Sequence, residues 1–303
     1  MNIEQYYRQL TQKLTAIDSD TAQLDARFLI CHYLKLDYTS FILQQADIIA
    51  DPILKQLQAA EKLALAHMPI SRILKSREFW GLEFVISADV LDPRADSEIL
   101  IETLLHFIPP SNQPLNILDL GTGTGCLLLS LLSEYINSTG IGIDYSEKAL
   151  KIANINATNL KLKNRCEFIK SNWFDELPSQ KFDIIISNPP YIPSIDINQL
   201  DDNVKLYDPL DALDGGLDGF DPYHIIARQA ANYLKPNGIL IFEMGYDQAD
   251  TLFEILHKNG FHSDMFEMQQ IASQQNLGKI RNGLGYDLGK NPRIIISKHK
   301  SID

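Results

Sequence analysis

The stretch that decides the fold is ILDLGTGTG, residues 117–125. Its first four residues read as a buried strand, and glycines then occupy alternate positions before a helical segment begins at Cys126. Glycine at Gly121 and Gly123 permits unusual backbone angles and lets a ligand come close to the main chain. The dinucleotide-binding fingerprint has its third glycine where this chain has Cys126, so the loop departs from that fingerprint. The stretch predicts a strand, a ligand-binding turn and a helix.

Strand and helix patterns alternate around this loop. Expected strands cover residues 116–120, 139–144, 166–170, 183–187 and 238–243. Expected helices between them cover residues 126–135, 146–159 and 223–234. Such alternation is typical of the α/β class, with a mostly parallel sheet between two layers of helices. Strands at residues 262–268 and 293–297 are expected to finish the sheet in the antiparallel direction, with a long loop rich in Gln, Asn and Gly at residues 269–291.

The chain begins with helical patterns. Residues 3–74 place apolar side chains three and four positions apart, which predicts a small all-α bundle. Leu24 and Phe28 fall on one face of an expected helix. Asp51 is the expected cap of a later helix, with Pro52 at its first position, where a missing N–H is not needed.

A β-hairpin is expected between this bundle and the sheet. Residues 79–86 read FWGLEFVI, an aromatic and β-branched run around one glycine, which favours two short paired strands. A helix over residues 97–107 follows. The chain is therefore expected to comprise a helical domain at residues 1–75, a hairpin linker at residues 76–93 and the sheet domain at residues 94–303.

The composition indicates a globular protein. Of its 303 residues, 45% are hydrophobic and 22% are charged, and the formal net charge is −12. Phosphate binding needs a basic surplus, so this charge argues against a nucleic-acid partner. Three widely spaced cysteines favour a reducing compartment over a disulfide frame or a zinc cluster. Because no signal peptide and no run of about 20 apolar residues is evident, we expect a cytoplasmic protein with no membrane partner.

Residues at other strand ends add to a candidate cofactor site. Asp119 places negative charge beside the glycine loop, which disfavours a pyrophosphate and tolerates a cation such as a sulfonium. Asp144 closes the next strand, where a carboxylate can accept both hydroxyls of a ribose; the alternative is that it caps the following helix. Trp173 follows the third strand and lies either over an adenine edge or in the core. Ligands of open α/β sheets bind at such strand ends.

The fourth strand ends in Asn188-Pro189-Pro190-Tyr191, which we call the NPPY ledge. Each proline fixes its own φ and keeps the preceding residue extended, so the ledge is rigid. It carries two acceptors, the Asn188 side-chain oxygen and the Pro189 carbonyl, and the aromatic face of Tyr191. A planar group with an NH2 has two donors that suit two fixed acceptors. The alternative is that the prolines only end a strand and that Tyr191 packs.

The glycine loop, Asp144 and the NPPY ledge together resemble the class I S-adenosylmethionine-dependent methyltransferases that methylate amino groups, which implies a Rossmann-like sheet. Further segments resemble the protein-(glutamine) methyltransferase family, and within it the branch that acts on peptide chain release factors: REFWGLEF at residues 77–84, PRADSE at 93–98, LYDP at 206–209 and ALDGGLDG at 212–219. The resemblance covers about residues 20–298. It implies that residues 1–75 recognise the substrate and that residues 94–303 form the methyltransferase domain.

The resemblance also implies the site and its ligands. The implied cofactor is S-adenosylmethionine, converted to S-adenosylhomocysteine, with no metal. Its expected contacts are Asp119, Gly121, Thr122, Gly123, Thr124, Gly125, Asp144, Trp173 and Asn188. The expected substrate contacts are Asn188, Pro189, Pro190 and Tyr191, of which Asn188, Pro189 and Tyr191 are the expected catalytic residues. The implied substrate is the glutamine of the Gly-Gly-Gln motif in class I peptide chain release factors, whose methylation modulates translation termination.

The chemistry expected at the NPPY ledge is positioning by fixed dipoles. An amide nitrogen is a poor nucleophile because its lone pair is delocalised. We expect Asn188 Oδ1 and the Pro189 carbonyl to accept the two amide hydrogens, and Tyr191 to pack on the amide plane. The alternatives are a ribosomal-protein glutamine, an adenine amine of DNA or RNA, and a non-catalytic binding module. The acidic charge argues against adenine, and the intact ledge argues against a mere binding module.

Overall fold

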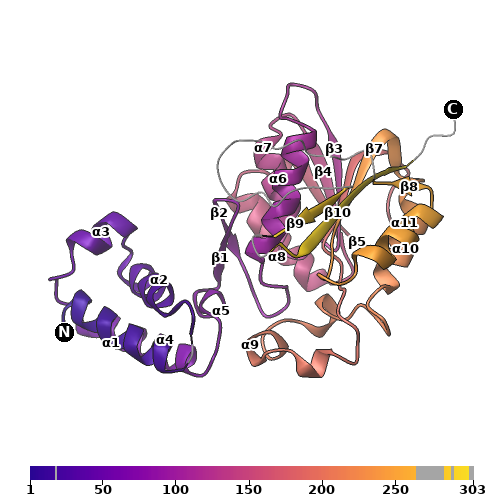
Figure 1. The fold of residues 1–303 in the computed structure, drawn as a ribbon. Helices are drawn as coiled ribbons and strands as arrows, with labels where there is room; N and C mark the ends of the chain where they lie inside the picture. Colours follow the sequence, from indigo (N-terminus) through magenta and orange to yellow (C-terminus); the bar gives the residue numbers. More distant parts are fainter. Residues whose placement is uncertain (18, 264–282, 288–289, 300–303) are drawn as a thin grey trace. The chain divides into compact units, whose positions relative to one another are not determined.

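The computed structural model describes residues 1–17, 19–263, 283–287 and 290–299. These residues form two compact units (Figure 1). The helical unit consists of Met1–Ser76 with Asp201–Tyr207, and the sheet unit consists of Arg77–Leu200 with Asp208–Asp303.

The helical unit is a small bundle with its own core. Its helices are α1 (Ile3–Ala16), α2 (Ala22–Leu34), α3 (Tyr38–Leu43), α4 (Asp51–Leu65), α5 (Ile70–Leu74) and α9 (Asp202–Lys205). Asn2 and Gln5 start α1 with a capping box, in which each side chain accepts a hydrogen bond from the other residue's backbone N–H. Leu10, Leu29 and Leu57 are among the residues that fill the core. The bundle predicted for residues 3–74 is confirmed.

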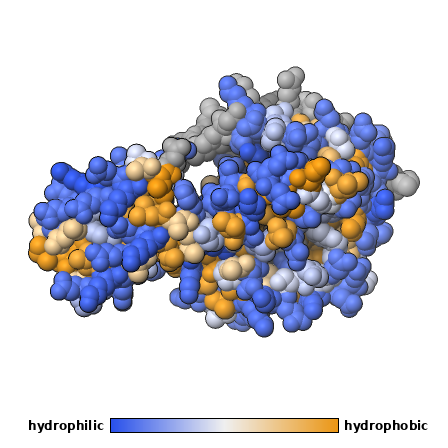
Figure 2. All heavy atoms as spheres, turned by 90° about the horizontal axis from the view of Figure 1, so that it is seen from below, coloured by the Kyte–Doolittle hydropathy of each residue, from blue (hydrophilic) through white to orange (hydrophobic). Residues whose placement is uncertain are grey.

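Two details of this bundle differ from the prediction. Ala50 is the N-cap of α4, so Asp51 and Pro52 are its first two residues. Proline is tolerated at both positions because these N–H groups have no acceptor within the helix. On α2, Leu24 and Phe28 are 38% and 44% exposed, while smaller residues and Leu29 face the core. Figure 2 shows apolar residues on the visible surface of the helical unit.

A two-stranded hairpin lies next in the chain. Its strands are β1 (Ser76–Phe79) and β2 (Leu82–Val85). Trp80 and Gly81 join them with positive φ angles of 53° and 66°, the backbone form that matches the twist of paired strands. The Trp80 backbone N–H donates to Glu98 and its indole N–H donates to Glu134, so the hairpin is tied to the helices beside the sheet.

One eight-stranded sheet organises the described part of the sheet unit. In spatial order its strands are β5 (Cys166–Lys170), β4 (Thr139–Asp144), β3 (Asn116–Leu120), β6 (Phe182–Ser187), β7 (Leu234–Glu243), β10 (Pro292–His299) and β8 (Phe261–His262), with β9 (Leu284–Tyr286) also paired to β10. The pairs from β5 to β7 are parallel, and those of β10 with β7, β8 and β9 are antiparallel. The predicted α/β sheet with an antiparallel finish is confirmed.

Helices cover both faces of this sheet (Figure 1). They are α6 (Glu98–Phe107), α7 (Cys126–Glu134), α8 (Glu147–Asn159), α10 (Asp221–Ala230) and α11 (Ala249–Lys258), with 3-10 turns at Ala95–Ser97, Lys163–Arg165, Ile197–Gln199 and Leu210–Ala212. Successive strand residues alternate between the faces, so Ile117 packs with residues of α6 and α7 while Leu118 packs with residues of α10 and α11. Among the helices in the described ranges, none has the length and apolar character that a membrane span requires.

The C-terminal strands differ from the prediction in extent. β7 begins at Leu234 instead of residue 238, because Leu234 pairs with Phe182 before the register shifts. Of the strand expected at residues 262–268, positions 264–268 lie outside the described residues. The loop expected at residues 269–291 is wrong over 284–286, where β9 pairs with β10, and positions 269–282 and 288–289 lie outside the described residues.

Candidate functional site

The carboxyl ends of three adjacent strands meet at one place. β3 lies between β4 and β6, and Leu120 pairs with Ile143 on one side and with Ser187 on the other. The next residues along these strands are Gly121, Asp144 and Asn188. The chain passes from β3 to β4 and β5 on one side and then crosses to β6 on the other, so the strand order reverses here. Open α/β sheets bind ligands at such a point.

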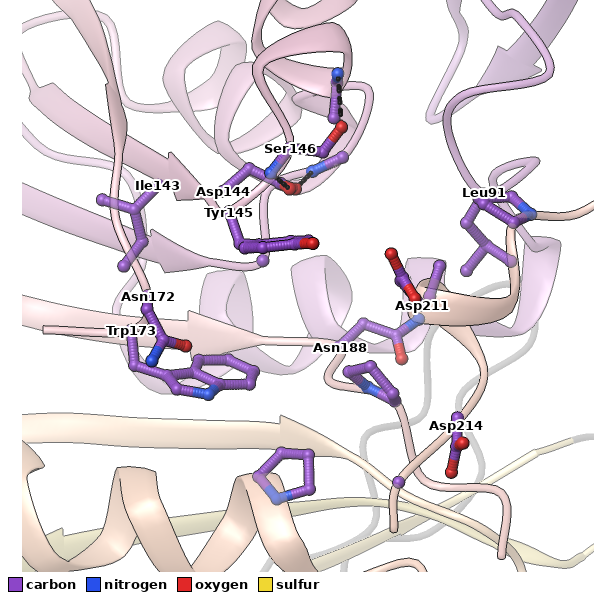
Figure 3. A pocket seen from close by; sticks show the side chains of 18 of the residues that line it. Leu91, Ile143, Asp144, Tyr145, Ser146, Asn172, Trp173, Asn188, Asp211 and Asp214 are labelled. Carbon is purple, nitrogen blue, oxygen red and sulfur yellow. Dashed lines mark hydrogen bonds between the residues drawn. The ribbon is translucent and has the colours of Figure 1, made fainter. Parts of the chain in front are cut away.

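A cavity of about 580 Å³ opens at these strand ends (Figure 3). Part of the predicted site lines it: Gly121, Gly123, Asp144, Trp173, Asn188 and Pro190. Other predicted site residues are not among the described residues of its wall: Asp119, Thr122, Thr124, Gly125, Pro189 and Tyr191. Figure 3 shows Asp144, Trp173 and Asn188 around the same space, each from the end of a different strand.

Several wall residues were not predicted as site residues. They include Val90 and Leu91 after the hairpin, Tyr145 after β4, and Pro209, Asp211 and Asp214 between β6 and α10. In the sequence, the family resemblance was the only indication that residues 212–219 could belong to the site. Nothing in the local pattern places residues 90 and 91 beside the glycine loop, because packing between distant segments brings them there.

The glycine loop leaves its backbone open to a ligand. Gly121 and Gly123 have φ angles of +73° and +53°, and a Cβ at either position would meet no atom within 4 Å. A side chain there would enter open space in a conformation that L-residues rarely adopt. The Gly123 N–H donates to Asp144 Oδ2 at 2.9 Å, which fixes the loop to the end of β4.

Asp144 holds two segments with one carboxylate. Its Oδ2 accepts from the Gly123 N–H, and its Oδ1 accepts from the Ser146 N–H at 2.8 Å. The pKa of Asp144 is raised by burial, and the two backbone hydrogen bonds oppose part of this rise. The side-chain cap of α8 is Ser146, which bonds the Ala149 N–H, so the helix does not need Asp144 as its cap. Since a carboxylate has about four acceptor positions, Asp144 retains capacity for ligand hydroxyls.

Buried polar groups support the loop behind the cavity. Asp119 is fully buried and accepts a hydrogen bond from Thr122 Oγ1 at 2.6 Å. Burial raises the pKa of Asp119 to about 7, with the Thr122 hydroxyl opposing the rise. The Gly125 N–H donates to the Thr122 carbonyl at 2.7 Å, and the Cys126 N–H donates to Thr124 Oγ1 at 3.3 Å. These bonds set the shape of the loop.

Trp173 lies at the cavity wall in a strained backbone conformation. Its φ is +53°, a region that costs most residues roughly 1 kcal/mol. The Ser171 hydroxyl holds the turn by donating to the Trp173 carbonyl at 2.8 Å and accepting from the Glu176 N–H at 3.0 Å. The ring is half-buried and also packs on the core beneath α10 and α11. Trp173 therefore lines the cavity and packs on the core at once, and its contact with an adenine stays a prediction.

The NPPY ledge presents two acceptors that no described residue uses. Asn188 Nδ2 donates to Ser97 Oγ at 3.2 Å, and no described residue donates to Asn188 Oδ1. Pro189 is buried, and within the described ranges nothing donates to its carbonyl. Because buried carbonyls rarely remain without a donor, this one is suited to a ligand. Tyr191 packs against the core, and its hydroxyl donates to Glu243 Oε1 at 3.5 Å.

These groups define which ligands the cavity suits. Asp144 offers acceptors to hydroxyls, the glycine loop permits a close approach, and Trp173 offers an aromatic surface. The NPPY ledge offers two acceptors to an NH2 group. For a metal ion, the described residues contain no cluster of three or more His, Cys, Asp or Glu side chains placed to hold one.

Two family models match the chain. The PrmC N-terminal domain matches residues 5–74, and a methyltransferase domain matches residues 111–284. Among solved structures, a methyltransferase from Pyrococcus furiosus has a TM-score of 0.47 at 15% identity, covering 82% of this chain and 98% of that one.

Curated relatives are similar over most of their length. The release factor glutamine methyltransferase of Agrobacterium fabrum is 40% identical over 241 residues, which cover 78% of this chain and 83% of that protein. The protein of the same name from Bradyrhizobium diazoefficiens is 39% identical over 257 residues, which cover 84% of this chain and 86% of that protein. The chain belongs to the release factor glutamine methyltransferase family.

Proposed function

We propose that this protein transfers a methyl group from S-adenosylmethionine to the side-chain amide nitrogen of the Gly-Gly-Gln glutamine in class I release factors. The observation that carries this proposal is the pair of free acceptors at Asn188 and Pro189 beside the cavity. The names of the relatives at 39–40% identity support the choice of substrate.

The cavity residues fit S-adenosylmethionine. When bound, this compound supplies an electrophilic methyl group on a positively charged sulfur. Asp144 has acceptor capacity for ribose hydroxyls, and Gly121 and Gly123 leave room beside the main chain. Asp211 and Asp214 add carboxylates to the wall, which favours a cationic ligand over one that carries phosphates.

The NPPY ledge acts by holding the substrate amide. Asn188 Oδ1 accepts one amide hydrogen and the Pro189 carbonyl accepts the other, which fixes the direction of the nitrogen lone pair. Both oxygens carry partial negative charge, so they stabilise the positive charge that develops as the nitrogen gains its methyl group. The sulfur–methyl bond of the donor would break as the N–C bond forms, which would leave S-adenosylhomocysteine. One amide proton would then leave to water, so that the methylated amide is neutral again.

An adenine amine has the same two donors as a glutamine amide. The net charge of −12 favours the amide, because a nucleic acid would be repelled. The test is to incubate the protein with methyl-labelled S-adenosylmethionine and, separately, a class I release factor, its Gln→Ala variant and DNA. We expect label in the unaltered release factor alone. Label in DNA, or equal label in the Gln→Ala variant, would contradict the proposal.

A further inference from the structure

Ser97 ends the 3-10 turn Ala95–Ser97 and leads directly into α6, with helical backbone angles and no side-chain cap bond. A capping serine has a non-helical backbone and accepts a hydrogen bond from a backbone N–H of the first turn, so the Ser97 hydroxyl is not needed as a cap. Ser97 is instead 3% exposed, donates its hydroxyl hydrogen to Glu243 Oε2 and accepts from Asn188 Nδ2 at 3.2 Å. The hydroxyl is thus turned away from its own helix and towards the NPPY ledge.

Glu243 is the buried end of this chain of hydrogen bonds. It is the last residue of β7 and is 4% exposed. β6 and β7 pair Ser187 with Phe242, so Asn188 and Glu243 directly follow paired residues. Neither Ser97 nor Glu243 is among the described residues of the cavity wall. Glu243 also meets the NPPY ledge directly, because a hydrogen bond from Asn188 opposes the rise that burial causes in its pKa, and the Tyr191 hydroxyl donates to its Oε1. Any effect of Ser97 and Glu243 on a ligand therefore passes through the NPPY ledge.

The direction of the hydrogen bonds sets the orientation of the Asn188 amide. A hydroxyl has one hydrogen, and an ionised carboxylate can only accept. Once Ser97 has donated its hydrogen to Glu243, its oxygen has only lone pairs left for Asn188. The atom of Asn188 that faces Ser97 is then Nδ2, and Oδ1 points the other way. A neutral group at position 243 permits the reverse order, in which Ser97 donates to Oδ1.

We propose that Ser97 and Glu243 are positioning residues that hold Asn188 with Oδ1 directed at the substrate amide. This inference rests on the proposed function, in which Oδ1 accepts an amide hydrogen. In the reversed orientation, the NH2 group of Asn188 would meet the NH2 group of the substrate. Two donors would then face each other, and one of the two acceptors of the NPPY ledge would be lost.

Kinetics of matched variants test this role. We expect Ser97→Ala and Glu243→Gln to lower kcat for release factor methylation at least about tenfold, with the cofactor Kd changed less than about twofold. Ser97→Thr keeps the hydroxyl and is expected to restore most of kcat. Ser130→Ala is the control, because Ser130 is equally buried and its hydroxyl has no partner in the described structure. Unchanged kcat in the first two variants, or a Ser97→Thr as slow as Ser97→Ala, overturns the inference.

A pH profile separates positioning from a merely structural role. Burial raises the pKa of Glu243 to about 7, with the Ser97 hydroxyl opposing the rise. The ionisable groups that face it are Asp96 before α6, Arg293 on β10, Tyr191 after β6, Tyr223 on α10 and Cys126 on α7. At saturating cofactor, kcat of the unaltered protein is expected to fall as the pH drops below about 7, and kcat of Glu243→Gln to lack this fall. The same acid limb in both proteins overturns the inference.

A measurement without substrate keeps the inference separate from the proposed function. The Asn188 Nδ2 protons can be followed by NMR and assigned by their loss in Asn188→Ala. We expect their signals to shift across about pH 6–8 in the unaltered protein and to stay constant in Glu243→Gln. Signals that stay constant in the unaltered protein overturn the inference. If the unaltered protein methylates no release factor, the proposed function fails, and this titration still decides the role of Glu243.

Discussion

Asn188 presents its two amide atoms to different surroundings. Nδ2 faces the Ser97 hydroxyl, and Oδ1 has no donor among the described residues. The Pro189 carbonyl is the second acceptor in the proposed mechanism, and the two prolines fix the backbone that carries it. At the residue scale, the proposed mechanism uses these two acceptors to hold the substrate amide and requires no strong base.

Removing the Asn188 side chain should separate chemistry from cofactor binding. We expect Asn188→Ala to lower kcat roughly 10²–10³-fold, because one of the two fixed acceptors is lost. Calorimetric titration with S-adenosylmethionine should show only a small change, since the glycine loop and Asp144 are intact. Asn259→Ala is the control, because among the described residues its side-chain amide bonds only the Ile255 carbonyl on α11. Near-normal methylation by Asn188→Ala would exclude the proposed role.

The buried carboxyl of Asp119 makes stability depend on pH. Burial raises its pKa from 3.8 to about 7, so between these values the folded protein keeps a proton that the unfolded chain releases. The free energy of unfolding therefore falls as the pH rises through this window. Asp119→Asn cannot titrate, so its stability relative to the unaltered protein should rise across the window by up to ~4 kcal/mol.

Urea denaturation followed by tryptophan fluorescence measures this effect, because both tryptophans, Trp80 and Trp173, belong to the sheet unit. Asp214→Asn provides a control of opposite sign. The Ser194 hydroxyl lowers the pKa of Asp214, so the unaltered protein loses that contribution as the pH falls. Parallel pH dependence in the unaltered and Asp119→Asn proteins would show that Asp119 does not titrate in this window.

At the scale of elements, the glycine loop after β3 and the hairpin loop between β1 and β2 share one backbone feature. Gly123 and Gly81 both have positive φ, and a Cβ at either would meet no atom within 4 Å. Only Gly123 lines the cavity. A side chain added at Gly81 therefore strains the backbone alone, whereas one added at Gly123 strains the backbone and also enters the cavity.

Alanine at these two glycines should have equal effects on stability and different effects on binding. We expect Gly123→Ala and Gly81→Ala each to cost about 1–2 kcal/mol of unfolding free energy, because both impose a left-handed conformation on an L-residue. Gly123→Ala should also weaken S-adenosylmethionine binding at least about tenfold, because its methyl group enters the cavity. Urea denaturation and calorimetric titration give the two quantities. Equal cofactor affinity in both variants would remove Gly123 from the binding site.

The strands could be predicted from the sequence, because each one is marked by a local run of apolar residues. The alternation of strand and helix patterns located β3 to β6, and the carboxyl ends of these strands located Gly121, Asp144 and Asn188. Ser97 and Glu243 were not predicted, because they lie 146 residues apart and neither has a local signal that links it to the other. Ser97 read only as a helix start, since a serine before an apolar run is the usual sign of one.

At the scale of the whole molecule, the alternation of strands and helices predicted the sheet, and the early helical periodicity predicted the bundle. The spacing of apolar residues alone did not predict which face of α2 is buried in the bundle. Leu24 and Phe28 share a face that is apolar, but Ala22, Ala26, Leu29 and Ile30 are the residues that the bundle buries. Which of two apolar faces is buried depends on the other helices, and the local pattern does not record that choice.

The exposed aromatic residues of the helical unit are candidates for substrate recognition, which the family resemblance implies for residues 1–75. Phe28 and Tyr38 are 44% and 60% exposed, and the Arg27 guanidinium lies 5.6 Å and 4.7 Å from their ring centroids. We expect the double variant Phe28→Ala/Tyr38→Ala to raise the KM for the release factor at least about fivefold, because exposed aromatic and Arg residues often dominate protein contacts. The values of kcat and of the cofactor Kd should not change.

Steady-state kinetics with varied release factor measures this effect. Ile136→Ala is the matched control, since Ile136 is an exposed apolar residue of the sheet unit. An unchanged KM in the double variant would exclude this surface from recognition. A loss of cofactor binding would show that the variant disturbs the fold.

The most direct measurement is the site of methylation on a class I release factor. After incubation with the protein and S-adenosylmethionine, the release factor is digested and its peptides are sequenced by mass spectrometry. One added methyl group is predicted on the amide of the Gly-Gly-Gln glutamine, and none when Asn188→Ala replaces the unaltered protein. A release factor that stays unmethylated, or a methyl group on any other residue, would contradict amide methylation at the NPPY ledge.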